Sequence, residues 1–456
     1  MRALLVSTYD LGRQPFGLAS PAAWLRRAGV EVDCADTSRQ PLDDSRISAA
    51  SMIAFYLPMH TATRMAAPLI ERVRRVNPAA RLCAYGLYAP LNAGWLRDRG
   101  IHDVLGPEAE QDLVALANSQ LSTPNSQSPT PSSEGIARLA FIQPDRQDLP
   151  SPERYASLQM PDGSLRVMGS TDATRGCKHL CRHCPIVPVY QGQFRVVPVD
   201  VVIDDIQAQV AAGAQHISFG DPDFLNGPTH ALRLVERFAR ECPGITYDAT
   251  IKIEHLLDHA EMLSVLRDTG CLFITSAVES IDDEVLAKLR KGHTRADFAW
   301  AVALCRQAGI RLTPTFIPFT PWASLEGYVE MLDVLDELDL VEDVAPIQLA
   351  IRLLVTAESP LLELPDIAGV VEPFDPTSLT WPWRHRDPRV DALHAAVMQV
   401  VAGTGNAPRA DVFDAISAVA RGSLGLLPAP RAGRGATPGP RATEPWYCCA
   451  EPMEQF

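Results

Sequence analysis

Residues 175–185 read RGCKHLCRHCP and place Cys177, Cys181 and Cys184 at the spacing C-x3-C-x2-C. Four cysteines close a structural zinc or iron–sulfur site, whereas three on one short loop hold an iron–sulfur cube and leave one iron without a protein ligand. An iron in that state can bind an outside molecule. Two alternatives stay open on these residues alone: a zinc site completed by a histidine of the same stretch, and three unrelated thiols.

The triplet is the signature of the radical S-adenosylmethionine (SAM) enzymes, and the chain resembles that family. The resemblance implies a [4Fe–4S] cluster on Cys177, Cys181 and Cys184, with the amino and carboxylate groups of SAM on the open iron. It also implies one-electron cleavage of SAM to methionine and a 5′-deoxyadenosyl radical, which abstracts hydrogen from a substrate. A reductase or flavodoxin-type protein would donate the electron.

The length and net charge of the chain limit the number of domains and the kinds of partner that we expect. The chain has 456 residues, which suits two or three domains, and 41 Lys+Arg against 55 Asp+Glu give a net charge of −14. This charge disfavours an extended nucleic-acid partner. The first seven residues resemble a buried strand rather than a signal peptide, and no apolar run reaches the roughly 18 residues of a membrane helix. Isolated cysteines and an oxygen-sensitive cluster favour a cytoplasmic location.

Residues 1–117 alternate apolar strands with helical patterns, which predicts a doubly wound, Rossmann-like parallel sheet. The expected strands are 3–7, 30–34, 51–56, 82–85 and 103–105. The region resembles the cobalamin-binding-type domain of one radical SAM branch. Members that bind cobalamin through histidine carry D-x-H-x-x-G after the first strand, but residues 10–15 read DLGRQP, and His60 is a lone histidine. The resemblance therefore leaves cobalamin without a histidine ligand, or no cofactor, as the alternatives.

Residues 118–135 are rich in Ser, Pro, Thr, Gln and Asn, which predicts a disordered linker. Residues 136–355 then repeat a strand–helix unit and predict a partial (β/α)6 radical SAM barrel. Residues 356–426 are expected to be helical, and 427–456 a flexible tail. The expected barrel strands are 166–170, 215–219, 246–252, 271–278, 310–316 and 346–354.

Chemistry in such barrels gathers at the carboxyl ends of the strands, which selects the candidate site residues. Gly220, with Asp221 or Asp223, resembles the turn that receives the amino group of SAM, although an ordinary Asp-Pro turn is the alternative. Lys252 is a candidate for the carboxylate of SAM, and His255 for contact with substrate or for moving a proton. A surface ion pair and a helix-start histidine are the structural alternatives.

The next strand ends at Glu279 and Ser280, and resembles the strand end of the family that binds the ribose hydroxyls. Arg352 lies among apolar residues, where a buried guanidinium needs a partner. The candidates are a carboxylate of SAM or of substrate, and an Asp or Glu of the chain itself.

The tail ends with the adjacent thiols Cys448 and Cys449 in the sequence CCAEP. This ending resembles the CUAEP/CCAEP-tail radical SAM proteins, some of which have selenocysteine at the second position. The preceding linker has a reach of roughly 25 Å. We expect the two thiols to quench or donate to a substrate radical, bind a soft element such as arsenic, or hold an intermediate. An inert tail is the alternative.

The predicted function is therefore a radical SAM enzyme that acts on an unidentified small molecule or peptide, with the tail cysteines assisting. One alternative is a non-catalytic soft-metal or thiol redox module. The other is a cobalamin-dependent radical SAM methyltransferase, which the N-terminal region keeps open.

Overall fold

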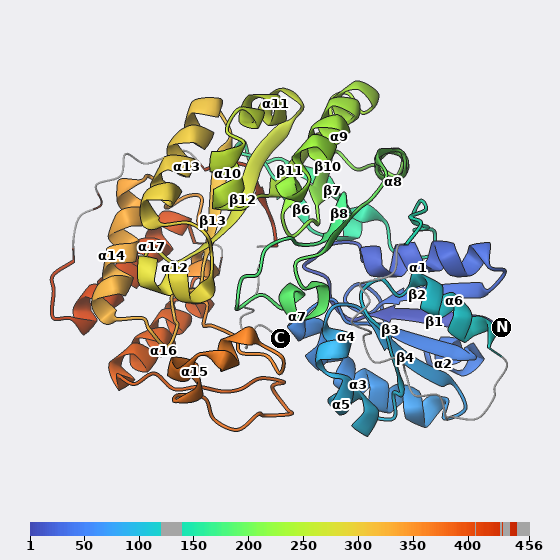
Figure 1. Cartoon of the computed structure of the whole chain (residues 1–456). Helices are drawn as coiled ribbons and strands as arrows, with labels where there is room; N and C mark the ends of the chain where they lie inside the picture. Colours follow the sequence, from blue (N-terminus) through green and yellow to red (C-terminus); the bar gives the residue numbers. More distant parts are fainter. Residues whose placement is uncertain (120–138, 406, 429–430, 432–437, 445–456) are drawn as a thin grey trace.

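The computed structural model describes residues 1–119, 139–405, 407–428, 431 and 438–444. Two α/β units lie side by side, the N-terminal one in blue and the second in green to orange (Figure 1). The short helix α7 (Ile186–Tyr190) lies between them and packs against α4 (Tyr88–Leu91) of the N-terminal unit. Within the described residues, no helix combines the length and apolar character that a bilayer crossing requires.

The N-terminal unit is a five-stranded, fully parallel sheet, as the sequence predicts, and its strand order is β2-β1-β3-β4-β5. Alternate residues of each strand pack into two apolar layers, with Leu4 and Val6 on one face and Ala3 and Leu5 on the other. Helices cover both faces (Figure 1). Strand order reverses at β1, which is where open α/β sheets form their binding crevice. The strands are β1 (Arg2–Ser7), β2 (Glu31–Asp36), β3 (Met52–Tyr56), β4 (Arg81–Tyr85) and β5 (Asp103–Val104), and the other helices are α1 (Phe16–Arg27), α2 (Asp44–Ala49), α3 (His60–Val76), α5 (Ala93–Asp98) and α6 (Glu110–Asn118).

The second unit is a curled seven-stranded sheet with the order β13-β12-β11-β10-β7-β6-β14. The five strands from β13 at one edge to β7 are parallel and carry the predicted helical connections, while β6 and β14 pair antiparallel at the other edge. The strands are β6 (Ser157–Gln159), β7 (Leu165–Thr171), β10 (His216–Phe219), β11 (Thr246–Thr250), β12 (Cys271–Glu279), β13 (Arg311–Phe316) and β14 (Arg441–Ala442). The helices are α8 (Val199–Ala211), α9 (Pro228–Glu241), α10 (Ile253–Asp258), α11 (Met262–Asp268), α12 (Asp283–Leu289), α13 (Arg295–Ala308) and α14 (Leu325–Glu337).

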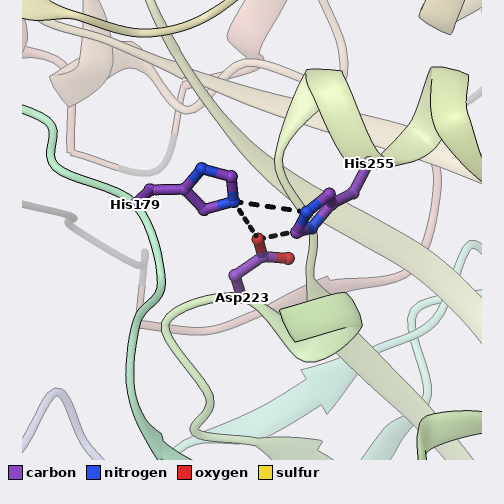
Figure 2. Close-up of side chains that lie close together, drawn as sticks. All are labelled: His179, Asp223 and His255. Carbon is purple, nitrogen blue, oxygen red and sulfur yellow. Dashed lines mark hydrogen bonds and ion pairs between the residues drawn. The ribbon is translucent and has the colours of Figure 1, made fainter. Parts of the chain in front are cut away.

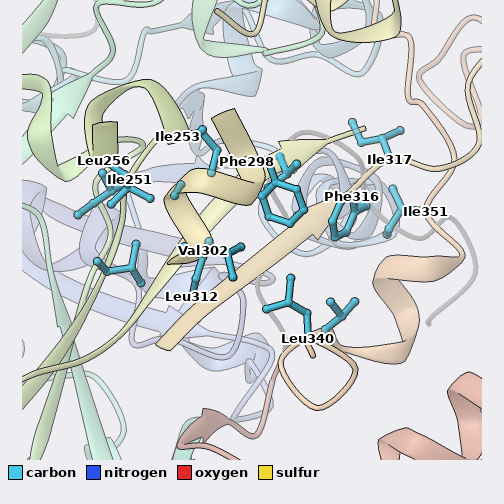
Figure 3. Close-up of a cluster of buried hydrophobic side chains, with 14 of the residues drawn as sticks. Ile251, Ile253, Leu256, Phe298, Val302, Leu312, Phe316, Ile317, Leu340 and Ile351 are labelled. Carbon is cyan, nitrogen blue, oxygen red and sulfur yellow. The ribbon is translucent and has the colours of Figure 1, made fainter. Parts of the chain in front are cut away.

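The core of this unit lies between the sheet and its helices. Figure 3 shows Phe298 and Val302 of α13 beside Leu312 and Phe316 of β13, all of them buried. Burial of these apolar side chains holds the strands in their curled arrangement. The polar carboxyl ends of the strands consequently meet at one rim.

The predicted sixth barrel strand, 346–354, is wrong. Pro346–Leu349 forms a 3-10 turn, and a single parallel bridge joins Phe319 to Arg352. The side chain of Gln348 accepts a hydrogen bond from Phe316 N at 3.3 Å. This side-chain bond replaces one of the main-chain hydrogen bonds that a sixth strand would make with β13. A proline at the start of the turn removes a further main-chain donor.

The predicted flexible tail is also wrong in part, because Arg441–Ala442 pairs with β6. Thr443 N donates to Ser157 O at 2.8 Å, and Thr443 Oγ1 accepts from Ser157 N at 3.0 Å. These bonds cover the edge of the sheet. Cys448 and Cys449 lie outside the described residues, as does the predicted linker except for its first two residues, where Asn118 ends α6.

The predicted helical region contains η4 (Pro360–Glu363), α15 (Pro365–Ala368), α16 (Pro388–Gly403) and α17 (Arg409–Ser423). Arg352 joins this region to the barrel: Nη1 donates to Asp391 Oδ1 at 2.8 Å, Nη2 donates to Trp383 O at 2.7 Å, and the guanidinium lies 3.6 Å from the Trp383 ring centroid. Its assignment to cofactor binding is therefore corrected, since the partner is an Asp of the chain itself.

Buried polar contacts fix the two units against each other. Arg175 Nη1 donates to Glu110 Oε1 at 2.7 Å, with side-chain exposures of 9% and 2%, and Arg175 Nη2 donates to Ser20 Oγ at 3.1 Å. Arg13 Nη2 reaches Ser218 Oγ at 3.0 Å in the barrel. The stretch that begins at Arg175 is therefore held by the N-terminal unit.

Candidate active site between the two units

A cavity of about 270 Å³ lies between the carboxyl ends of the two sheets. Asp10, Tyr56 and Tyr88, which lie at or just after the ends of β1, β3 and β4, line its N-terminal wall. Gly220 and Lys252, which follow β10 and β11, line the barrel wall. Both sheets thus contribute the edge at which α/β folds bind ligands.

Cys177, Cys181 and Cys184 line this cavity from the loop after β8 (Thr174–Gly176), and none of them is in a disulfide. The loop is held by Asn226, whose Oδ1 accepts from Lys178 N at 3.2 Å. The donor set fits a [4Fe–4S] cluster, because three thiols of one loop share one cavity.

Gly176 gives the loop its shape. Its φ is +78°, and a Cβ at this position would lie 2.4 Å from Tyr190 Cδ1 and 2.6 Å from Gln193 O. Only glycine fits this position without displacing the loop.

Gly220 lines the cavity, and a Cβ there would lie 2.3 Å from Asp172 Oδ1. Asp221 points away from the cavity: Oδ2 accepts from Ala173 N at 2.9 Å and Oδ1 from Thr174 Oγ1 at 2.5 Å. Burial raises the pKa of Asp221 to about 7, with a further contribution from Asp172. Asp221 therefore fixes the backbone that leads into the cysteine loop.

Glu279 is buried at the end of β12, where Oε1 lies 3.1 Å from His183 Nε2 and 3.5 Å from Lys291 Nζ. Burial raises the pKa of Glu279, but Lys291 and His183 outweigh it, so that the pKa is lowered. The backbone φ of Glu279 is +69°, and the pairing register of β12 with β13 shifts here. Such a conformation is costly for a side chain with a Cβ, and strain of this kind gathers at functional sites.

Lys252 lines the cavity, and its Nζ donates to Glu254 Oε2 at 3.0 Å. Ser280 Oγ accepts from Asp282 N at 3.0 Å and shapes the turn after β12. Lys252 and Lys291 both line the cavity, so the barrel wall presents two ammonium groups beside the cysteine loop.

Figure 2 shows His179, Asp223 and His255 turned toward one another. His255 Nδ1 lies 2.6 Å from Asp223 Oδ2, and His179 Nε2 lies 3.3 Å from His255 Nε2. Burial opposes ionisation of Asp223, but its contacts with the two histidines lower its pKa to about 2. His255 is thus buried against Asp223, and of the three only His179 lines the cavity.

His60 does not offer a ligand to the cavity, because its Nε2 lies 2.6 Å from Ser378 O. Burial lowers the pKa of His60 to about 4, although the Ser378 contact opposes this. These contacts give His60 a structural role.

Of the residues at the site, His179 and His183 are suggested by the sequence only as ligands of the alternative zinc site, and Lys291 is not suggested as a site residue at all. Both histidines lie inside the cysteine stretch, so their position in the sequence was a usable signal. Lys291 follows α12, and only the fold brings it back to Glu279. The contacts of all three cross between separate elements, which spacing alone does not reveal.

Residues 172–335 match the model of the radical SAM superfamily. The chain contains a radical SAM domain. This domain covers the cysteine loop, the strands from β10 to β13 and the helices between them.

Two curated relatives of this chain are, by name, a methyltransferase and a synthase. The bacteriochlorophyllide d C-12(1)-methyltransferase of Chlorobaculum tepidum is 29% identical over 126 residues, which is 27% of each chain. The tRNA-2-methylthio-N(6)-dimethylallyladenosine synthase of Fusobacterium nucleatum is 26% identical over 189 residues, 37% of this chain and 41% of that one. The chain thus spans less than half the length of either relative.

Two solved structures share the fold. One is OxsB, a cobalamin-dependent SAM radical enzyme whose structure contains aqua-cobalamin and SAM. Its TM-score is 0.68 at 15% identity, and the match covers 88% of this chain and 66% of the OxsB chain. The other is the methyltransferase TsrM of Kitasatospora setae, with tryptophan and a SAM analogue bound. Its TM-score is 0.60 at 18% identity, and the match covers 74% of this chain and 71% of the TsrM chain. Both likenesses extend beyond the radical SAM domain, whose match ends at residue 335.

Proposed function

We propose that the chain is a radical SAM enzyme whose [4Fe–4S] cluster is held by Cys177, Cys181 and Cys184. The observation that carries this proposal is that all three cysteines line one cavity at the carboxyl ends of the barrel strands. When bound, the cluster supplies one electron to SAM, which breaks into methionine and a 5′-deoxyadenosyl radical that takes a hydrogen atom from the substrate. An electron donor of the reductase or flavodoxin type, in a reducing cytoplasm, belongs to this proposal.

The cavity wall supports roles for the chain's own residues. Lys252 and Lys291 suit the carboxylate of SAM, and the backbone of Gly220, which lines the same cavity, suits its amino group. Asp221 acts as a positioning residue through Ala173 and Thr174. Ser280 supports the turn after Glu279.

Replacing Glu279 with glutamine is expected to weaken SAM binding by about 10–100-fold, because a charged hydrogen-bond partner contributes about 1.5–3 kcal/mol. The exchange removes the negative charge that holds Lys291 and His183, which both line the cavity. Equilibrium dialysis of the reconstituted protein with SAM measures the change. Glu284→Gln, an exposed exchange on the following helix, is the control. Equal affinities in the two variants would contradict the role of Glu279.

The tail cysteines belong to the same proposal. Tyr9 Oη donates to Glu444, and Arg39 Nη2 lies 3.3 Å from Glu444 Oε2. Glu444 also packs on Gly12, whose neighbours Leu11 and Arg13 line the cavity. Cys448 is four residues further on, which limits its backbone to about 14 Å from Glu444. This anchor supports a role for Cys448 and Cys449 in assisting turnover at the cavity.

Changing Cys448 and Cys449 to serine is expected to abolish substrate turnover while SAM cleavage continues. Incubation of the reduced protein with SAM and cell extract, followed by comparison of products, tests this. Cys242→Ser, at a buried thiol of the barrel core, is the control. If the double exchange leaves the products unchanged, the tail has no role in turnover. If the parent protein never cleaves SAM and the double exchange removes its metal uptake, the result would instead favour a soft-metal or thiol module.

A second candidate function is cobalamin-dependent methylation. The observation that favours it is that the carboxyl edge of the N-terminal parallel sheet forms one wall of the cavity. The chain also shares its fold with OxsB, a cobalamin-dependent enzyme, and with the methyltransferase TsrM. His60 is bonded to Ser378, and residues 10–15 contain no histidine, so a corrin would lack a histidine ligand from either. Corrinoid absorbance after purification with added cobalamin would support this candidate, and its absence would remove it.

A further inference from the structure

Three polar groups from different elements converge beside the cysteine loop. His179 belongs to that loop, Asp223 follows β10, and His255 lies on α10 (Figure 2). Their side-chain exposures are 14%, 0% and 2%. One ligand atom from each lies within 4.8 Å of the others. Buried groups of this kind are normally joined by well-formed hydrogen bonds.

His179 Nε2 and His255 Nε2 form a hydrogen bond, but the two short contacts to Asp223 Oδ2 are not hydrogen bonds of ordinary geometry. His255 Nδ1 lies 2.6 Å from Asp223 Oδ2, and His179 Nε2 lies 3.4 Å from the same oxygen. Across the described residues, no hydrogen bond of ordinary geometry reaches Asp223 Oδ2 or His255 Nδ1. The atoms are therefore gathered more closely than their mutual hydrogen bonding accounts for.

Two of the three distances in the cluster match those between ligands of a metal ion, whereas the third, 2.6 Å between His255 Nδ1 and Asp223 Oδ2, is shorter. Bonds of 2.0–2.1 Å in a tetrahedral site place neighbouring ligand atoms about 3.4 Å apart. His179 Nε2 lies 3.4 Å from Asp223 Oδ2 and 3.3 Å from His255 Nε2. Two nitrogens and one carboxylate oxygen favour zinc, iron or another transition metal over magnesium or calcium.

Outer contacts orient these ligands. Asp223 Oδ1 accepts from Leu225 N at 3.3 Å and Lys252 N at 3.5 Å, which turns Oδ2 toward the histidines. His179 Nδ1 lies 3.6 Å from Glu254 Oε2. A carboxylate behind a histidine favours the Nδ1–H tautomer, so that the lone pair of Nε2 faces Asp223 and His255. Electron pairs that converge in this way attract a cation.

We propose that His179, Asp223 and His255 bind one divalent transition-metal ion at a site separate from the iron–sulfur cluster. His179 lines the cavity, which gives the ion a route of access and room for a ligand from the cavity. The ion joins the cysteine loop, the turn after β10 and α10 at one point. The proposal does not depend on SAM chemistry, because it rests on the contacts of these three side chains.

Zinc binding to the reconstituted full chain tests the proposal. Cys448 and Cys449 are replaced by serine in all samples, because those thiols also bind zinc. Equilibrium dialysis should give one zinc per chain in addition to the cluster iron, and Asp223→Asn should abolish this stoichiometric binding. Asp248→Asn, in the buried pair of His216 with Asp248, is the matched control and should retain it. Absence of zinc binding by the parent protein, or binding that survives Asp223→Asn, would overturn the proposal.

A second variant covers the case in which Asp223→Asn fails to fold. Glu254 has a side-chain exposure of 38%, and Glu254→Gln should weaken zinc binding by about 10–100-fold while the iron content is unchanged. X-ray absorption at the zinc edge should show nitrogen and oxygen ligands. Sulfur at about 2.3 Å would instead place the zinc on cysteines and contradict the site. Iron content and SAM cleavage, measured on the same samples, separate a failure here from a failure of the proposed enzyme.

Discussion

Replacing Cys177, Cys181 and Cys184 together with alanine is expected to remove the cluster and abolish reductive cleavage of SAM. The reason is that these three thiols line the cavity from one loop and provide the ligands of the cube. Anaerobic reconstitution should give roughly four irons per chain in the parent protein and none above background in the variant. Chromatography of 5′-deoxyadenosine formed from SAM measures the activity.

Cys305→Ala is the matched control for this experiment, because Cys305 is a buried thiol of α13. We expect it to retain both iron and SAM cleavage. Iron that persists in the triple variant would contradict the assignment of the ligands. Iron in the parent protein without any 5′-deoxyadenosine would contradict the radical chemistry.

Replacing Glu110 with alanine is expected to destabilise the protein by about 3–5 kcal/mol. This is the usual cost when one partner of a buried ion pair is removed and the other charge stays buried. Arg175, which is the first residue of the cysteine stretch, would lose its carboxylate partner. The N-terminal unit would then no longer secure the loop, so cluster retention should fall as well. Denaturant unfolding measures the loss of stability.

Asp200→Ala provides the comparison, since Asp200 pairs with Arg237 at the surface and its side chain is 80% exposed. An exposed pair contributes about 0–1 kcal/mol. Similar losses in the two variants would contradict the view that the buried pair fixes the two units to each other.

The N-terminal sheet could be predicted from sequence because its information is local. Apolar strands alternate with amphipathic helices there, and each strand lies within a few residues of its expected bounds. The cysteine loop is similarly local, since its three thiols fall within eight residues. Patterns of this kind are visible in a single stretch of chain.

The errors have a different physical origin, which is contact between distant segments. Residues 346–354 are apolar enough for a strand, but a proline turn and the side chain of Gln348 replace the ladder. Arg441 and Ala442 lie in a stretch whose composition suggests a linker, yet they pair with β6. Arg352 found an internal partner, Asp391, that follows it by 39 residues.

The candidate site likewise contains residues that the sequence reveals and residues that only the fold brings together. Glu279 ends β12 and Lys252 follows β11, and both lie at the rim, as expected for polar residues at the carboxyl ends of barrel strands. The grouping of His179 with Asp223 and His255 was not foreseen, because three separate elements contribute one side chain each. Only the tertiary fold brings them together.

The electron paramagnetic resonance spectrum of the reduced cluster, recorded with and without SAM, tests the central claim most directly. If one iron of a cluster held by Cys177, Cys181 and Cys184 lacks a protein ligand, the amino and carboxylate groups of SAM bind it and the g values of the spectrum change. A spectrum that stays the same while dialysis shows SAM bound to the protein would contradict the account.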